Sequence, residues 1–248
     1  MLAKGRCEYI MKFLALIVVP LSTVSPHLAY ADAGNDRPFK LTIAEYRYND
    51  GGNGHDLNIR WRRGDTDVWI GAYRDPLFGM QTRAGVDTSF AMGGSAMLQP
   101  SLQVASGGFV GGSLNFQIGD PWFASAGWGR TNLKPYFNLN FDPNDAITAA
   151  IGWHGDNGRT VSLLLVADDR LHTRQKDWHL YGRWPLAEGL RVTLDLLRKT
   201  GDGDGGYVRS WGLSTTLDFP TWFLRLAHDP KQNFSTQDAT RVAVGVRF

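Results

Sequence analysis

The chain has 248 residues, with 26 Lys and Arg against 24 Asp and Glu, so its formal charge of +2 does not suggest a nucleic-acid partner. Its single cysteine, Cys7, excludes a disulfide framework within the chain. The 29 glycines and nine tryptophans, together with the near absence of helical periodicity, favour an all-β protein.

Residues 1–31 have the features of a cleaved signal peptide. A short basic region begins at Met11-Lys12, an apolar run covers 13–21, and Ala29-Tyr30-Ala31 fits a small-x-small cleavage site. The apolar run is shorter than the roughly 20 residues that a transmembrane helix needs. We therefore expect export, with a retained anchor as the alternative. Cleavage removes the cysteine, three basic residues and one acidic residue, which leaves a neutral mature chain over 32–248.

From residue 39 onward, segments of about ten residues alternate between apolar and polar side chains, and turn residues separate them. Pro100 has no backbone N–H, so it should mark a strand end or an irregularity. The predicted strands cover 39–48, 56–63, 68–74, 82–92, 97–105, 113–118, 122–128, one segment on each side of a turn at Asp156, 177–184, 191–196, 207–219, 222–226 and 240–248.

The final segment has the clearest alternation. One face carries Val242, Val244, Val246 and Phe248. The other face carries Arg241, Ala243, Gly245 and Arg247. This strand resembles the closing strand of bacterial outer-membrane β-barrels, in which Val244, Val246 and Phe248 would form the signal that the barrel-insertion machinery reads. The resemblance implies a bacterial outer-membrane location, with outer-membrane lipid and lipopolysaccharide as neighbours.

Single-chain bacterial barrels have an even number of strands, short periplasmic turns and longer extracellular loops. Counting every alternating segment gives an odd number, because residues 136–142 alternate as well. If those residues belong to a loop over 129–145, a closed antiparallel barrel of fourteen strands remains. Twelve strands are the alternative, if 95–118 holds fewer wall strands.

With fourteen strands, every turn falls on the expected side. The tight turns lie near Asp65, Gly94, Asp120, Asp156, Ala187 and Pro220 and become periplasmic. The longer loops lie near Gly52, Gly79, Gly107, Asn138, His172, Gly203 and Asn233 and become extracellular.

Lipid cannot solvate charges or backbone, so the apolar face must point outward and the polar face must line the lumen. An eight-stranded barrel is already filled by side chains, so a wider one holds water or an inserted loop. This predicts a porin-like passive channel for small hydrophilic solutes, with arginine prominent in its lining. The predicted pore-lining residues are Arg60, Arg62, Arg83, Asp87, Asn115, Gln117, Asp177, His179, Arg183, Arg191, Asp195, Arg225 and Arg247.

The loop over 129–145 is hydrophilic with interspersed aromatic residues. We expect it to fold inward as a constriction that brings Lys134 and Asp142 near the arginine-rich wall. An outward hairpin is the alternative. The predicted constriction residues are Lys134, Tyr136, Asn138, Asn140 and Asp142.

Two further functions are weighed against the channel. Asp177 and His179, near Asp168, are similar to the Asp-x-His element of the omptin outer-membrane proteases, which implies a surface hydrolase in which a carboxylate orients an imidazole. The paired acids that those enzymes also need have no counterpart, and alternation in a polar lumen produces such pairs by chance. A closed structural barrel is the third possibility.

The tryptophans and the remaining histidines are explained without a catalytic or ligand-binding role. The tryptophans are expected to form aromatic girdles at the membrane interfaces. The histidines have no metal-ligand spacing, so we expect neither a metal nor a cofactor.

Overall fold

The computed structural model describes residues 37–140 and 142–248, and the predicted signal peptide lies outside them. Two short 3-10 helices, η1 (Asp156–Gly158) and η2 (Gln232–Phe234), accompany the strands. The strands are β1 (Phe39–Tyr48), β2 (Asn53–Arg63), β3 (Thr66–Asp75), β4 (Gly79–Thr88), β5 (Phe90–Ala91), β6 (Ala96–Ala105), β7 (Phe109–Ile118), β8 (Trp122–Thr131), β9 (Ala146–His154), β10 (Thr160–Asp168), β11 (Lys176–Ala187), β12 (Leu190–Gly203), β13 (Gly206–Asp218), β14 (Trp222–Asp229) and β15 (Ala239–Arg247).

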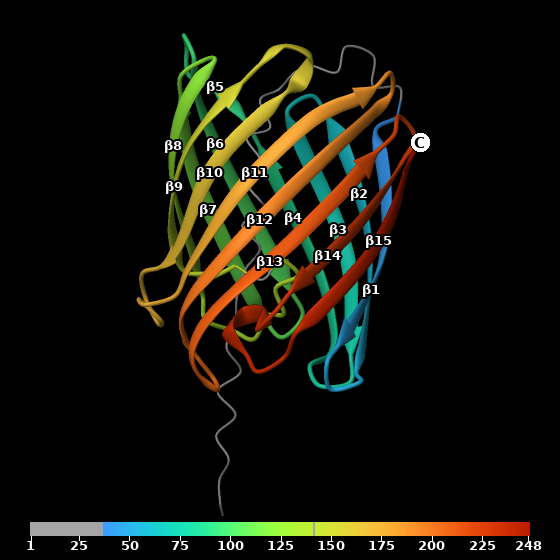
Figure 1. Ribbon diagram of the computed structural model, residues 1–248, viewed down its shortest axis with the longest axis vertical. Coiled ribbons are helices and arrows are strands. Elements are labelled where there is room, and N and C mark those ends of the chain that lie inside the picture. Colours follow the sequence, from blue (N-terminus) through green and yellow to red (C-terminus); the bar gives the residue numbers. More distant parts are fainter. Residues whose placement is uncertain (1–36, 141) are drawn as a thin grey trace, which may run out of the picture.

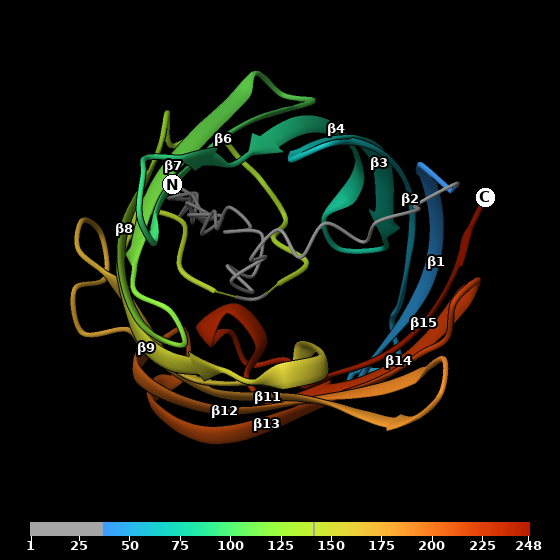
Figure 2. The same ribbon diagram turned by 90° about the horizontal axis from the view of Figure 1, so that it is seen from above.

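These strands form one closed antiparallel sheet (Figures 1 and 2). The first strand, β1, pairs with the last, β15, and this pairing closes the barrel. Both β4 and β5 pair with β6, so they are two parts of one wall strand. The wall therefore has fourteen strands, and the predicted closed fourteen-stranded barrel is confirmed.

The interruption between β4 and β5 lies opposite Pro100. Asp87 pairs with Ser101 and Phe90 pairs with Leu98, but no pair forms between these two positions. On its other side Pro100 pairs regularly with Leu114. Because Pro100 has no backbone N–H to donate, the ladder is interrupted on the side of β4 and β5, and the expected irregularity falls at this residue.

The outer face of the barrel is apolar along the strands. Large side chains such as Ile43, Ile70 and Leu213 are exposed there, while their neighbours in sequence point inward. A broad exposed apolar belt around a closed sheet is what a lipid environment requires. No helix in the described part of the chain is long and apolar enough to cross a membrane.

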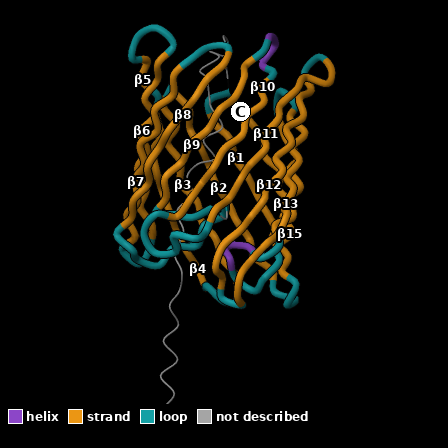
Figure 3. The backbone as a smooth tube through the Cα atoms, turned by 60° about the vertical axis from the view of Figure 1, so that its left-hand side comes forward, coloured by secondary structure: helices purple, strands orange, loops and turns teal. Residues whose placement is uncertain are grey.

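The strands tilt around the barrel, and the connections lie at its two ends (Figure 3). At one end all connections are short, and the C-terminus lies there (Figure 1). At the other end, 132–145, 169–175 and 230–238 are long. We assign the end with the long loops as extracellular. The loops predicted near Gly52, Gly79, Gly107 and Gly203 are shorter than expected, because the strands run almost to their tips.

Most tryptophans point outward, among them Trp61, Trp122 and Trp211. Trp69 is the exception to the expected girdle, since its side chain is buried inside the barrel. Its ring lies over Gly85 on the neighbouring strand, where a Cβ would be 2.5 Å from a ring atom. The missing side chain of Gly85 therefore makes room for an inward aromatic residue.

The constricted barrel interior

The loop over 132–145, here called the crossing loop, folds into the barrel and crosses its interior (Figure 2). Tyr136 stacks on Phe109 of β7, with ring centroids 4.3 Å apart. Phe137 stacks on Tyr73 of β3, also at 4.3 Å. Such pairs contribute about 0.5–1.5 kcal/mol each beyond the area they bury. Aromatic side chains therefore hold the first half of the loop against the wall.

The backbone of the crossing loop finds its hydrogen-bond partners on the wall. The Gln81 side chain on β4 accepts from the Phe137 N–H (2.8 Å) and donates to its carbonyl (3.2 Å). Arg241 on β15 donates to the Leu139 carbonyl at 3.0 Å. Leu139 belongs to a buried cluster that includes Tyr46 of β1. Since buried backbone groups need partners, these contacts fix the loop in one position.

The second half of the loop ends in a charged contact. Asp142 Oδ1 lies 2.9 Å from His179 Nε2 on β11. The other ring nitrogen, Nδ1, lies 3.0 and 3.1 Å from the two carboxylate oxygens of Asp195 on β12. Ionised carboxylates only accept, so both nitrogens must donate and the ring carries a positive charge. His179 therefore joins the crossing loop to the wall through charge-assisted hydrogen bonds.

A second buried ion pair lies beside this contact. Lys199 Nζ, fully buried on β12, lies 3.0 and 2.8 Å from the carboxylate oxygens of Asp229 on β14. Asp177 is also fully buried and pairs with Lys199 in the strand register, yet neither of its oxygens has a hydrogen-bond partner. Lys199 and Asp229 were missed in the sequence, although extending the alternation of β12 beyond Asp195 places Lys199 inward.

This environment does not suit the hydrolase hypothesis. Both nitrogens of His179 are occupied by carboxylates, so the ring has no free site from which to take a proton from water. Asp168 instead accepts the backbone N–H groups of Arg170, Leu171 and His172, and so organises a turn. The three candidate catalytic residues are not brought together as a nucleophile-activating group.

The predicted constriction residues have different surroundings. Tyr136, Asn138 and Asp142 are buried and Asn140 is half-buried, whereas Lys134 is exposed. Asp142 contacts His179, one of the predicted lining residues, and that the loop places Lys134 and Asp142 near the arginine-rich wall stays a prediction. Two arginines contact the loop elsewhere: Arg241 donates to the Leu139 carbonyl, which no side-chain pattern could indicate, and Arg170 lies 2.9 Å from Asp145.

In the periplasmic half, arginines gather around two buried carboxylates. Asp67 contacts Arg62 at 2.5 Å and Arg60 at 3.4 Å. Asp218 contacts Arg247 at 2.6 Å, with Arg183 and Arg191 at 3.6 and 3.7 Å. Of the other predicted lining residues, Arg83 pairs with Asp56, and Asn115 and Gln117 are buried on the inner face of β7.

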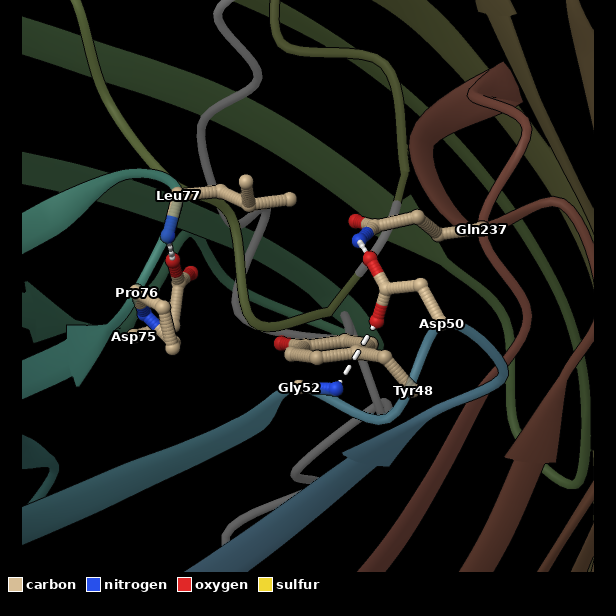
Figure 4. Close-up of a pocket in the computed structure, with 7 residues that line it drawn as sticks. All are labelled: Tyr48, Asp50, Gly52, Asp75, Pro76, Leu77 and Gln237. Carbon is tan, nitrogen blue, oxygen red and sulfur yellow. Dashed lines mark hydrogen bonds between the residues drawn. The ribbon is translucent and has the colours of Figure 1, made fainter.

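At the extracellular end a hollow of about 160 Å³ opens between three hairpin loops (Figure 4). Asp50 binds the Gly52 N–H at 2.9 Å and the Gln237 amide at 2.6 Å, and these bonds close one side of the hollow. Tyr48, Asp75 and Leu77 line the rest. Within the described residues, no group of three or more Asp, Glu, His or Cys side chains is placed to hold a metal ion.

No family model matches the chain, and no curated relative matches its sequence. Among solved structures, it is similar to the outer membrane protein Omp33 of Acinetobacter baumannii, with 10% identity over 87% of this chain and 100% of that chain and a TM-score of 0.58. It also matches the NanC porin (7% identity, 84% and 100% covered, TM-score 0.47) and the KdgM porin in complex with disordered oligogalacturonate (11%, 84% and 99%, 0.46).

The likeness to Omp33, a bacterial outer membrane protein, establishes a shared closed-barrel fold. A closed barrel with an apolar outer belt is the form in which strands cross such membranes, so the fold agrees with the predicted outer-membrane location. Function has to be argued from the interior itself.

Proposed function

We propose that the protein is a porin-like passive channel for small hydrophilic solutes in a bacterial outer membrane. The observation that carries this proposal is the exposure of inward-pointing arginines. The side chains of Arg60 and Arg183 point into a closed barrel and are 22% and 29% exposed, so there is open space beside them inside the wall. Charged groups at such positions need water, because burial in a dry interior would be costly.

The crossing loop supplies the selectivity by size in this proposal. It occupies the extracellular half of the interior, and the backbone of η2 lies inside the ring beside it (Figure 2). Phe234 of η2 is buried. Solutes would enter beside it, from the hollow between the hairpin loops, and leave along the arginine-lined periplasmic half. The mixed charges along this route would then select by charge as well as by size.

Reconstitution of the purified barrel into planar bilayers tests the proposal. We expect stepwise single-channel currents from the wild type and larger steps after deletion of residues 133–141. Replacement of the exposed Lys134 by Gln should leave the step size almost unchanged, since its side chain lies at the loop surface. Unchanged steps in the deletion variant would refute the constriction, and silence of both proteins would favour a closed structural barrel.

A cleavage assay separates the channel from the hydrolase. Peptides rich in basic residues should remain intact with the wild type and with Asp177→Ala alike, because His179 has no free nitrogen. Cleavage by the wild type that is lost in the variant would reverse this conclusion.

We also propose that the barrel-insertion machinery recognises β15 and that the assembled barrel sits among outer-membrane lipid and lipopolysaccharide. Val244 and Val246 point outward on this strand, and Phe248 follows it at the barrel rim. An exposed strand with this pattern presents apolar side chains and an edge to a partner during assembly.

A further inference from the structure

The charges inside the periplasmic half lie on one side of the wall only. Seven inward-facing cations are found on β1, β2, β11, β12, β14 and β15 and are here called the basic wall: Lys40, Arg60, Arg62, Arg183, Arg191, Arg225 and Arg247. The inward faces of β6, β7, β8 and β9, which the structure describes completely, carry no Asp, Glu, Lys or Arg. The basic wall therefore faces amides, hydroxyls and aromatic rings.

The basic wall is not neutralised by its own carboxylates. Asp67 and Asp218 lie beneath it with side chains 7% and 6% exposed, and Asp87 on β4 is the third inward acid of this region. Asp195 of β12 also faces inward beside Arg225, so four carboxylates stand against seven cations and positive charge remains in excess. Asp67 and Asp218 are buried against guanidinium groups of Arg62 and Arg247, while the side chains of Arg60 and Arg183 stay 22% and 29% exposed inside the barrel.

Three of the cations are direct neighbours. In the strand register, Lys40 of β1 pairs with Arg60 of β2 on one side and with Arg247 of β15 on the other. Lys40 Nζ and the Arg247 guanidinium both lie 5.8 Å from the ring centre of Phe223. Asp67 contacts Arg60 and Asp218 contacts Arg247, whereas Lys40 between them has no ion-pair partner among the described residues. Like charges at paired positions repel each other, so a further anion beside Lys40 would be favourable.

Two members of the basic wall, Lys40 and Arg225, have no ion-pair partner among the described residues. Within this part of the chain, the only bond of the Arg225 guanidinium is to Thr216 Oγ1 at 3.0 Å. In addition, the enclosed Nε atoms of Arg60 and Arg183 have no acceptor. Charged donors without acceptors in a partly enclosed space are the complement of an oxyanion.

We propose that the basic wall is a binding step for small solutes that carry a carboxylate or phosphate group, with Lys40 and Arg225 as its principal contacts. This rests on the proposed channel function and adds the charge class of the solute. An anion here would lie between Arg225 and the row formed by Arg60, Lys40 and Arg247. Several partly exposed cations attract without holding tightly, and this is what passage requires.

The test combines selectivity with direct binding. In planar bilayers under a KCl gradient, the wild type should pass chloride in preference to potassium. The double variant Lys40→Gln/Arg225→Gln should reduce this preference by about tenfold, because it removes the interaction free energy of two partly exposed charge contacts. Arg63→Gln, at the same end of β2 but outward-facing and exposed, is the matched control and should not change it.

Inorganic phosphate binding to the barrel in detergent, measured by calorimetry, tests the site without requiring a current. We expect binding by the wild type and by Arg63→Gln, and about tenfold weaker binding by the double variant, with folding of each verified by heat-modifiable migration. Absence of phosphate binding in the wild type, or equal binding by the double variant, overturns the proposal. A silent barrel that still binds phosphate through these residues contradicts the channel and retains the site. A conducting barrel without anion preference supports the channel and contradicts the proposed anion site.

Discussion

His179 Nε2 lies 2.9 Å from Asp142 Oδ1, and this is the contact that joins the second half of the crossing loop to β11. The two residues are far apart in sequence, and the loop must cross the barrel before they meet. Because Asp195 holds the opposite nitrogen of the ring, the imidazole is fixed in orientation and presents a charged donor to the loop.

Asp142→Asn should loosen this end of the loop. The substitution keeps the size of the side chain but replaces a charge-assisted bond with a neutral one, a loss of about 1–2 kcal/mol. We expect more frequent transitions to a higher-conductance state in single-channel recordings. Lys134→Gln changes a charge on the same loop at an exposed position and serves as control. Identical gating in Asp142→Asn and wild type would mean that the contacts of the first half of the loop are enough to position it.

The aromatic contacts of that first half give a second prediction. Tyr136→Ala removes the ring that stacks on Phe109, and loss of a buried aromatic side chain costs about 3–5 kcal/mol where the site cannot collapse. We expect the first half of the loop to leave the wall and the mean conductance to rise. Tyr136→Phe retains the stacking ring and should behave as the wild type. A conductance rise in both variants would point to the hydroxyl group instead of the ring.

The strand pattern could be predicted because each wall residue obeys a local rule. In β15, Val244 and Ala243 face opposite sides in the order that period two requires, and lipid decides which side is apolar. The even-number rule then separated residues 136–142 from the wall, although they alternate like a strand. Their inward course could not be derived in detail, since Tyr136 and Phe137 are held by residues on distant strands.

The buried network under the loop was beyond sequence reasoning for the same reason. Asp177 and His179 were recognised as inward-facing, but the partners of His179 come from a loop and from another strand. Lys199 of β12 contacts Asp229 of β14 across the intervening strand β13. Which residues of β12 and β14 come together in this way depends on the tilt of the strands in the barrel. Alternation gives the face of each residue, whereas the contacts across the interior depend on how the loops fill it.

The end of the chain gives a third prediction. Phe248 stacks on Phe39 with ring centroids 5.7 Å apart, so its removal affects both a contact and the proposed assembly signal. Phe248→Ala should reduce the amount of assembled barrel in the outer membrane several-fold, whereas Phe39→Ala, which removes the same stacking contact, should reduce it much less. Quantification of the heat-modifiable form in membrane fractions decides this. Equal losses would assign Phe248 a packing role only.

A fourth prediction concerns acid sensitivity of the loop over 230–238. The Lys231 N–H donates to Asp238 at 3.0 Å, and this bond, with the Lys231 ammonium at 3.2 Å, holds the pKa of Asp238 below its ordinary value of 3.8. Because the pKa of Asp238 is lower in the folded loop, its ionised carboxylate stabilises the loop at pH values above the ordinary pKa of 3.8. This stabilisation is lost as the pH falls below 3.8 and through the lowered pKa of the folded state.

Hydrogen exchange of the backbone between about pH 5 and pH 3, corrected for intrinsic rates, should therefore show loss of protection in this loop at the acid end. Asp238→Asn should be less protected at pH 5 and should lack most of the further change, because the titrating group is absent. Acid-induced opening of equal size in the variant would assign the effect to another carboxylate, such as Asp50, whose pKa the Gly52 N–H and the Gln237 amide also lower.

The outward valines test the lipid environment directly. Val244 is 46% exposed in the middle of β15, with Leu224 on β14 and Ile43 on β1 as its paired neighbours on the outer face. Val244→Arg should destabilise the barrel by about 2–4 kcal/mol in lipid vesicles, because a charge at mid-membrane depth loses its hydration. Val244→Leu, which keeps an apolar contact with lipid, should be close to neutral in the same urea titration. A surface exposed to water would tolerate arginine as well as leucine, and that result would remove the basis for an outward lipid-facing sheet.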